Sequence, residues 1–290
     1  MKRSSLFRRP NKRSLADADR GSILFLAVAA LAILTILLAG VSFSVSQEWK
    51  LASFVTDANT SYDYALSDVT LMKEIWASRP LSLMMTLYDL RPRTMVLDGR
   101  TIEASFFDEE ALVHLKWSDR NTLLRLPGIS ENESLVDAII AAPIYAKEDL
   151  LAVKDMTIDV YDLMKDLVTV YGDGRININT VSPEVLSVLG ASQGFISAVE
   201  EYRAGEDGVE GTADDRVFNN VYEIGNDLAA WGLGAADQTW LQTLIVAQKL
   251  SVGSATVRCE LKVKKGQRLL KNFRIIIDLT TGVILRWDEQ

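Results

Sequence analysis

The most continuous hydrophobic pattern of the chain lies close to its start. Residues 22–45 carry no charged side chain, and about 20 apolar residues in a helix span a bilayer core of about 30 Å. The residues before this stretch are mainly basic, with Lys2, Arg3, Arg8, Arg9, Lys12, Arg13 and Arg20 against Asp17 and Asp19. The pattern predicts a single transmembrane helix with its N-terminus in the cytoplasm. A secretory signal cut after Ala39 or Gly40 is the alternative.

A second pattern follows directly and has the period of a helix. Apolar or small residues recur in steps of three and four at Leu51, Val55, Ala58, Tyr62, Ala65, Val69, Met72 and Trp76. This spacing predicts an amphipathic helix that continues the membrane helix and ends near Pro80. A membrane anchor followed by a separate core helix fits the same stripe.

Alternating apolar and polar residues then predict strands in two separate regions. Residues 94–117 indicate two or three strands with a turn at "LDGR", and the C-terminal part returns to strands around "KKGQ" and "LTTG". We expect both regions to share one sheet, because three short strands alone make a poor core. The predicted fold is α+β: a long N-terminal helix packed on a small antiparallel sheet, with a large inserted α-helical domain. The predicted parts are a leader (1–21), a transmembrane helix (22–45), the amphipathic helix and first strands (46–117), the insert (118–250) and the last strands (251–290).

The insert contains two similar helix–turn–helix phrases, "LLRLPGISENESLVDAII" and "SPEVLSVLGASQGFISAVEEYR". Ser182 is a predicted N-cap for a helix that begins at Pro183. The phrasing resembles helix-hairpin-helix units, which raises a membrane-anchored DNA receptor of competence as a rival function. The turns "SENES" and "ASQGF" contain no basic residue, and the net charge is −8. Nucleic acid is therefore not an expected partner.

Candidate chemistry is sparse along the chain. Cys259 is the single cysteine, so an internal disulfide is excluded. His114 is the single histidine and lies in a strand-like run without a nucleophile motif nearby, which favours a structural role over catalysis. We expect no enzyme activity.

One acidic loop is a candidate metal site. The stretch "AGEDGVEGTADDRVF" holds Asp207, Glu210, Asp214 and Asp215 among glycines, and carboxylate oxygens on a flexible loop suit calcium. The spacing is not that of an EF-hand, and a solvated acidic loop is the alternative interpretation.

The N-terminal segment as a whole resembles a type IV prepilin. A basic leader ends at Gly21, an apolar helix begins at Ser22, and an amphipathic helix follows. The resemblance implies that a prepilin peptidase of the inner membrane cuts between Gly21 and Ser22 and methylates the new terminus. The family's usual glutamate at the fifth mature position is Leu26 here. Such a carboxylate is understood to pair with the terminal amine of the subunit above, so its absence favours a position at a filament tip.

The combined features resemble the K-type minor pseudopilins of type II secretion systems. The stretch "GDGRININTVSPEVLSVLG" is close to that family's hallmark, and the final "RWDE" partly matches its last strand. The similarity is loose over residues 80–121, and the family's aspartate-rich "GAED" lobe is absent. The resemblance implies calcium in the helical domain, an inner-membrane anchor with a periplasmic C-terminal domain, and a tip subunit that starts and caps the pseudopilus. Its implied partners are the other minor pseudopilins and the major pseudopilin, with Leu26 and the stripe of residues 51–76 as contacts. A minor pilin of a related type IV system fits the same features.

Overall fold

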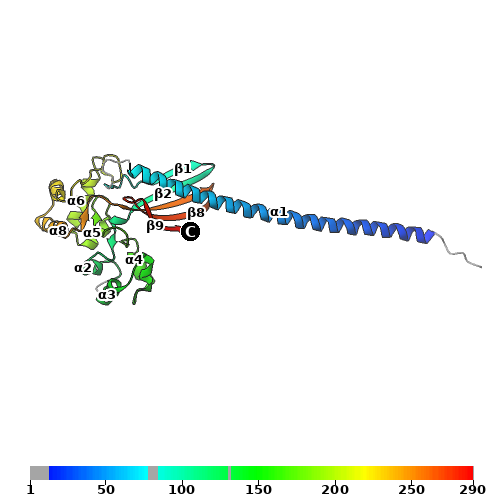
Figure 1. Ribbon diagram of the computed structural model, residues 1–290, viewed down its shortest axis with the longest axis horizontal. Coiled ribbons are helices and arrows are strands. Elements are labelled where there is room, and N and C mark those ends of the chain that lie inside the picture. The colour runs from blue at the N-terminus through cyan, green and yellow to red at the C-terminus, as the bar shows by residue number, and fades with distance from the viewer. Residues whose placement is uncertain (1–12, 78–83, 130–131, 290) are drawn as a thin grey trace, which may run out of the picture. The chain divides into compact units, whose positions relative to one another are not determined.

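The computed structural model describes residues 13–77, 84–129 and 132–289. The chain divides into two compact units, Met1–Thr60 and Ser61–Gln290. The elements in chain order are α1 (Arg13–Ala77), β1 (Arg93–Leu97), β2 (Arg100–Asp108), η1 (Glu109–Ala111), β3 (Val113–His114), α2 (Arg120–Leu124), α3 (Glu133–Ala141), η2 (Lys147–Ala152), α4 (Ile158–Met164), β4 (Val168–Thr169), β5 (Ile176–Asn177), α5 (Pro183–Leu189), α6 (Gln193–Arg203), α7 (Ile224–Asp227), η3 (Leu228–Trp231), α8 (Ala235–Val246), β6 (Leu250–Ser251), β7 (Thr256–Lys265), β8 (Arg268–Asp278) and β9 (Val283–Glu289) (Figure 1).

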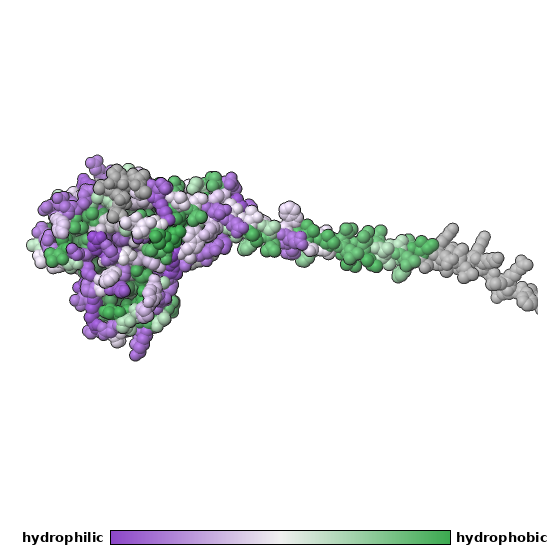
Figure 2. All heavy atoms as spheres, viewed as in Figure 1, coloured by the Kyte–Doolittle hydropathy of each residue, from purple (hydrophilic) through white to green (hydrophobic). Residues whose placement is uncertain are grey.

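Helix α1 runs without a break through both predicted helical patterns. Its stretch Ile23–Trp76 is, within the described part of the chain, the one helix long and apolar enough to cross a membrane by length and composition. Figure 2 shows hydrophobic side chains along the visible face of the first part of this stretch. One continuous helix, rather than an anchor and a separate core helix, therefore carries the stripe. Pro80, the predicted stop, lies outside the described residues.

The main sheet has five strands in the order β1-β2-β7-β8-β9, and all neighbours are antiparallel. Strand β2 pairs with β7 along the register from Thr101 opposite Lys264 to Asp108 opposite Val257. The two strand regions therefore form one sheet, as predicted. The "LDGR" turn joins β1 to β2 with positive φ at Asp98 (50°) and Gly99 (70°), which matches the right-handed twist of a tight hairpin.

The core of this part lies between α1 and one face of the sheet. Ala65, Val69, Met72 and Trp76 of the stripe are buried, as are alternate residues of β7. Side chains on a strand point to opposite faces in turn, so every second residue of β7 reaches the helix. The other part of the stripe is exposed: Leu51 is 64% and Val55 48% exposed. The second half of the predicted contact stripe is thus part of the core, and its first half lies on the surface.

The sheet has a defined direction relative to the packed half of α1. The hydroxyl of Tyr64 donates to Asp98 Oδ2 at 3.0 Å, so the β1–β2 turn lies beside the start of the packed half. Strand β2 runs from that turn to Asp108, where the chain leaves the sheet, and β7 re-enters it at Thr256. The insert is therefore attached to the opposite end of the sheet (Figure 1).

The insert has its own hydrophobic core, with Phe195, Phe218 and Leu123 fully buried. Both predicted helix–turn–helix units form, as α2 with α3 and α5 with α6. Ser182 caps α5 as predicted: its Oγ accepts from the Val185 amide at 3.3 Å. Gly190 ends α5 with φ 93°, a conformation that glycine adopts without steric cost.

The structure moves the predicted boundaries of the insert outward. The chain leaves the main sheet after Asp108 and returns at Thr256, beyond the expected limits 118 and 250 on both sides. The third strand expected before Trp117 is β3, and it pairs with β4 instead of joining the main sheet. Two-residue strands such as β3 form through tertiary contacts, so alternation in the sequence does not show which sheet they join.

Candidate functional site

A buried polar cluster joins the insert to the main sheet. We call it the junction cluster; its members are Asp108, Glu109, Glu110, Asn177, Asn179 and Thr180, all buried. Asp108 ends β2, and Asn177, Asn179 and Thr180 come from the "ININT" stretch. The cluster thus connects the strand at which the chain leaves the sheet with the stretch that resembles the family hallmark.

Asp108 is the centre of this cluster. Its Oδ2 accepts from Asn177 Nδ2 at 2.9 Å and from the Thr180 hydroxyl at 2.6 Å, and its Oδ1 accepts from the Glu110 amide at 2.8 Å. Asn177 Nδ2 also donates to the Met85 carbonyl at 3.0 Å. Burial raises the pKa of the Asp108 carboxyl above its ordinary value, although hydrogen bonds from Ser254, Thr180, Asn177 and the Glu110 amide oppose the shift. A buried polar group without partners is costly, so these bonds fix the position of "ININT" against the sheet.

The two glutamates after Asp108 extend the cluster to β7. Glu109 accepts from the Thr169 hydroxyl and pairs with Arg258 at 3.2 Å. Glu110 accepts from the Thr256 hydroxyl at 3.0 Å and from the Ala255 amide at 3.2 Å. Burial first, and then the charge of Asp108, raise the pKa of Glu110 to about 7. The junction therefore contains a carboxyl group that titrates near neutral pH.

Asn179 holds three remote backbone groups together. Its Nδ2 donates to the Phe218 and Val252 carbonyls at 2.9 Å each, and its Oδ1 accepts from the Phe218 amide at 2.8 Å. Sequence reasoning did not assign Asn177, Asn179 or Thr180 a role. The available signal was the alternation of asparagine with isoleucine in "ININT", where polar side chains fall inside an otherwise buried stretch.

The acidic loop does not present a ready calcium site. Glu210 pairs with the buried Arg203 at 2.7 Å, and Asp214 Oδ2 accepts from the Glu206 and Asp207 amides at 2.8 and 3.0 Å. Asp215 accepts from two loop amides, and Asp207 from one. In the described residues, no group of three or more acidic, histidine or cysteine side chains converges to hold a metal ion. The four carboxylates do not fit calcium as they lie, and calcium binding stays a prediction of the sequence.

The loop carboxylates instead stabilise the loop. Hydrogen bonds from the Thr212 hydroxyl and from the Asp207 and Glu206 amides lower the pKa of Asp214 to about 2. A carboxyl group with a lowered pKa contributes stability above its unfolded pKa, near 3.8, and this contribution is lost as the pH falls through about 2. The loop is therefore held by ionised carboxylates at neutral pH.

The predicted processing residues Gly21 and Ser22 lie within α1. Residues 1–12 of the predicted leader lie outside the described residues. Leu26 is 63% exposed on the apolar part of α1. An exposed leucine in this segment suits contact with lipid or with another membrane helix.

His114 has a structural role, as the sequence favoured. It is buried, and its Nδ1 accepts from the amides of Lys116 and Trp117 at 3.1 and 3.3 Å. Burial lowers the pKa of the imidazole, which keeps it neutral and able to accept.

Comparison with solved structures identifies the architecture. The chain is similar to a chain of the GspK-GspI-GspJ complex from the type 2 secretion system of enterotoxigenic Escherichia coli, with a TM-score of 0.62, 14% identity, and coverage of 81% of this chain and 97% of that chain. The chain has the fold of that chain of the secretion complex. The pilin-like base and the helical insert of the K-type resemblance are both present in it. No family model and no curated protein matches the sequence.

Proposed function

We propose that this chain is a K-type minor pseudopilin at the tip of a type II secretion pseudopilus, where it starts and caps assembly for protein export. The similar solved chain belongs to a complex of the type 2 secretion system. The observation that carries the tip position is the placement of the insert. It occupies the end of the sheet opposite to the end beside Tyr64, where α1 begins to pack.

This placement gives a physical reason for capping. In a filament built on parallel N-terminal helices, each subunit packs beside the helix and sheet of the next one. A bulky insert with its own core, fixed to the base through the junction cluster, blocks the space in which a further subunit would pack. Leu26 supports the same position, because the chain has no carboxylate there to pair with the terminal amine of a subunit above.

The remaining features of the role follow from the anchor. Cleavage between Gly21 and Ser22 by a prepilin peptidase, followed by methylation, releases a mature chain held in the inner membrane by α1. The anchor is single-pass, with the leader in the cytoplasm and the C-terminal domain in the periplasm. The partners are the other minor pseudopilins and the major pseudopilin, and the role requires no catalysis.

The tip position is tested by labelling assembled filaments. Pseudopili are overproduced with this chain tagged on exposed Tyr145 of the insert, and gold particles are located by electron microscopy. The proposal predicts one labelled end per filament. Label along the shaft would contradict it, and label at the tip of a type IV pilus instead would assign the chain to that related system.

In the described residues, the α5–α6 turn gives no observation that favours the DNA-receptor alternative. The α5–α6 turn contains Ala191 and Ser192, and the nearby Arg125 donates to the Leu189 carbonyl at 3.2 Å. Salt-dependent binding of duplex DNA by the full chain would nevertheless favour that alternative.

A further inference from the structure

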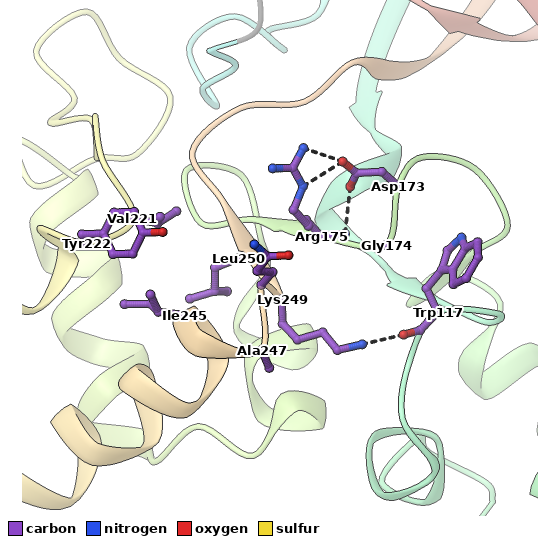
Figure 3. Close-up of a pocket in the computed structure, with 11 residues that line it drawn as sticks. Trp117, Asp173, Gly174, Arg175, Val221, Tyr222, Ile245, Ala247, Lys249 and Leu250 are labelled. Atoms are coloured by element: carbon purple, nitrogen blue, oxygen red, sulfur yellow. Dashed lines mark hydrogen bonds and ion pairs between the residues drawn. The ribbon is translucent and has the colours of Figure 1, made fainter.

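A surface pocket on the insert has no part in the proposed capping role. It has a volume of about 450 Å³ and is open to solvent, within the range of small-molecule sites. Its lining includes Trp117, Asp173, Arg175, Tyr222, Gln248 and Lys249, which come from distant parts of the insert sequence (Figure 3).

The pocket has an aromatic side chain at each end. Trp117 is 55% and Tyr222 71% exposed, and Figure 3 shows them on opposite sides of the lining with the charged residues between them. Large aromatic side chains lose favourable burial when they stay exposed, so a pair at the rim of one pocket indicates ligand contact. Two aromatic side chains on opposite sides of one pocket suit a ligand that has a ring at each end.

The middle of the pocket is polar, and its polar groups are held in place. Arg175 Nε and Nη2 donate to Asp173 Oδ2 at 2.7 and 2.5 Å, and Lys249 Nζ donates to the Trp117 carbonyl at 2.5 Å. These groups offer fixed donors and acceptors on one surface. A purely apolar ligand would remove water from these charged groups and offer no hydrogen bonds in its place, which is unfavourable.

Two backbone features shape the pocket. Gln248 follows α8 with φ 55°, and the amides of Gln248 and Lys249 close the helix end on the Ile245 and Leu244 carbonyls at 3.0 and 2.9 Å. Glycine is the usual residue at this left-handed position, yet here the residue is Gln248, which belongs to the lining. At Gly174 a side chain would not fit, because a Cβ there would lie 2.5 Å from Trp117 Cβ. Glycine therefore lets the Trp117 side chain pack against the loop.

We propose that this pocket binds a short saccharide chain. The C–H faces of sugar rings pack on Trp117 and Tyr222, and the hydroxyls between them exchange hydrogen bonds with the side chains of Asp173, Arg175, Gln248 and Lys249. The combination of separated aromatic ends and a mixed donor–acceptor middle matches this ligand class. The proposal does not depend on the tip position.

Binding is tested with the full-length chain in lipid nanodiscs. The probes are a tetramer of N-acetylglucosamine and a tetrasaccharide that alternates it with the carboxylated N-acetylmuramic acid, measured by calorimetry. Both are expected to bind, and Tyr222→Ala is expected to weaken binding by about tenfold through loss of ring packing. Tyr145→Ala, an 80% exposed tyrosine of the insert outside the pocket, is the matched control and should leave binding unchanged.

Gln248→Gly separates a binding role from a structural one. Glycine relieves the left-handed backbone, so this variant should melt at a higher temperature than the wild type and bind the tetrasaccharides more weakly. Absence of binding by both probes at millimolar concentration would overturn the proposal. So would equal weakening by Tyr145→Ala, unchanged binding by Gln248→Gly, or tighter binding of an acidic tetrapeptide than of either saccharide.

Discussion

At the scale of single residues, the polar side chains of "ININT" decide how the insert is attached. Asn177 and Thr180 bind Asp108, and Asn179 bridges Phe218 to Val252. The sequence shows these residues but not their partners, because each partner lies between 39 and 73 positions away along the chain. The acidic loop is a second example. The position of Glu210 in a glycine-rich acidic loop suggests a metal ligand, and only the fold shows that Arg203 is its partner.

Asn179→Ala tests the importance of the bridge. It leaves the Phe218 amide and two carbonyls without partners in a buried site, so the free energy of unfolding should fall by about 2–4 kcal/mol. Asn219→Ala is the control, because this exposed neighbour only bonds the Val217 carbonyl, and its effect should stay within about 0.5 kcal/mol. Denaturant unfolding of both variants measures the difference. Equal losses of stability would contradict a stabilising role for the Asn179 bridge.

Glu110→Gln tests the titration at the junction. The pKa of Glu110 is about 7 in the fold against an ordinary 4.5, so folding takes up a proton between these values. Its contribution to stability is fully present below pH 4.5 and is lost as the pH rises to about 7. Glutamine keeps the acceptor for Thr256 and removes the charge beside Asp108.

The difference in melting temperature, Glu110→Gln minus wild type, should therefore be larger at pH 8 than at pH 5. Thermal unfolding followed by circular dichroism at several pH values provides the comparison. A difference that does not change with pH would show that Glu110 does not titrate in this range.

At the scale of elements, α1 combines two environments in one helix. Its first part is apolar all round, while its second part is apolar only on the face that meets the sheet. The period of the sequence predicted both parts, since hydrophobic spacing is a local property. It did not show which part of the stripe is buried. Val55 and Val69 occupy equivalent positions in the stripe, but only Val69 packs against the sheet.

This division predicts unequal effects along the stripe. Met72 is 2% and Val55 48% exposed, so Met72→Ala should destabilise the fold by about 2–5 kcal/mol. Val55→Ala should change stability by less than about 0.5 kcal/mol. If unfolding of the two variants in nanodiscs showed similar losses, the exposed half of the stripe would be core as well.

At the scale of the whole molecule, the sequence predicted the α+β class, the shared sheet and the helical insert, because each depends on long periodic segments and on turn residues such as Asp98 and Gly99. It did not predict the two-residue pairs β3–β4 and β5–β6, which join distant segments. Nor did it place the insert boundary at Asp108. Strand β2 ends there, and the charged residues Glu109 and Glu110 that follow are buried. The fold is that of the similar chain in the solved secretion complex, and the processing of the N-terminus is the step on which the proposed role depends.

The most direct test is therefore the mature N-terminus, determined by mass spectrometry of the chain expressed with and without a prepilin peptidase. We expect a peptidase-dependent terminus at methylated Ser22. An intact leader in the presence of the peptidase, or a terminus beyond Ala39, would contradict it and make the apolar segment an ordinary anchor or signal.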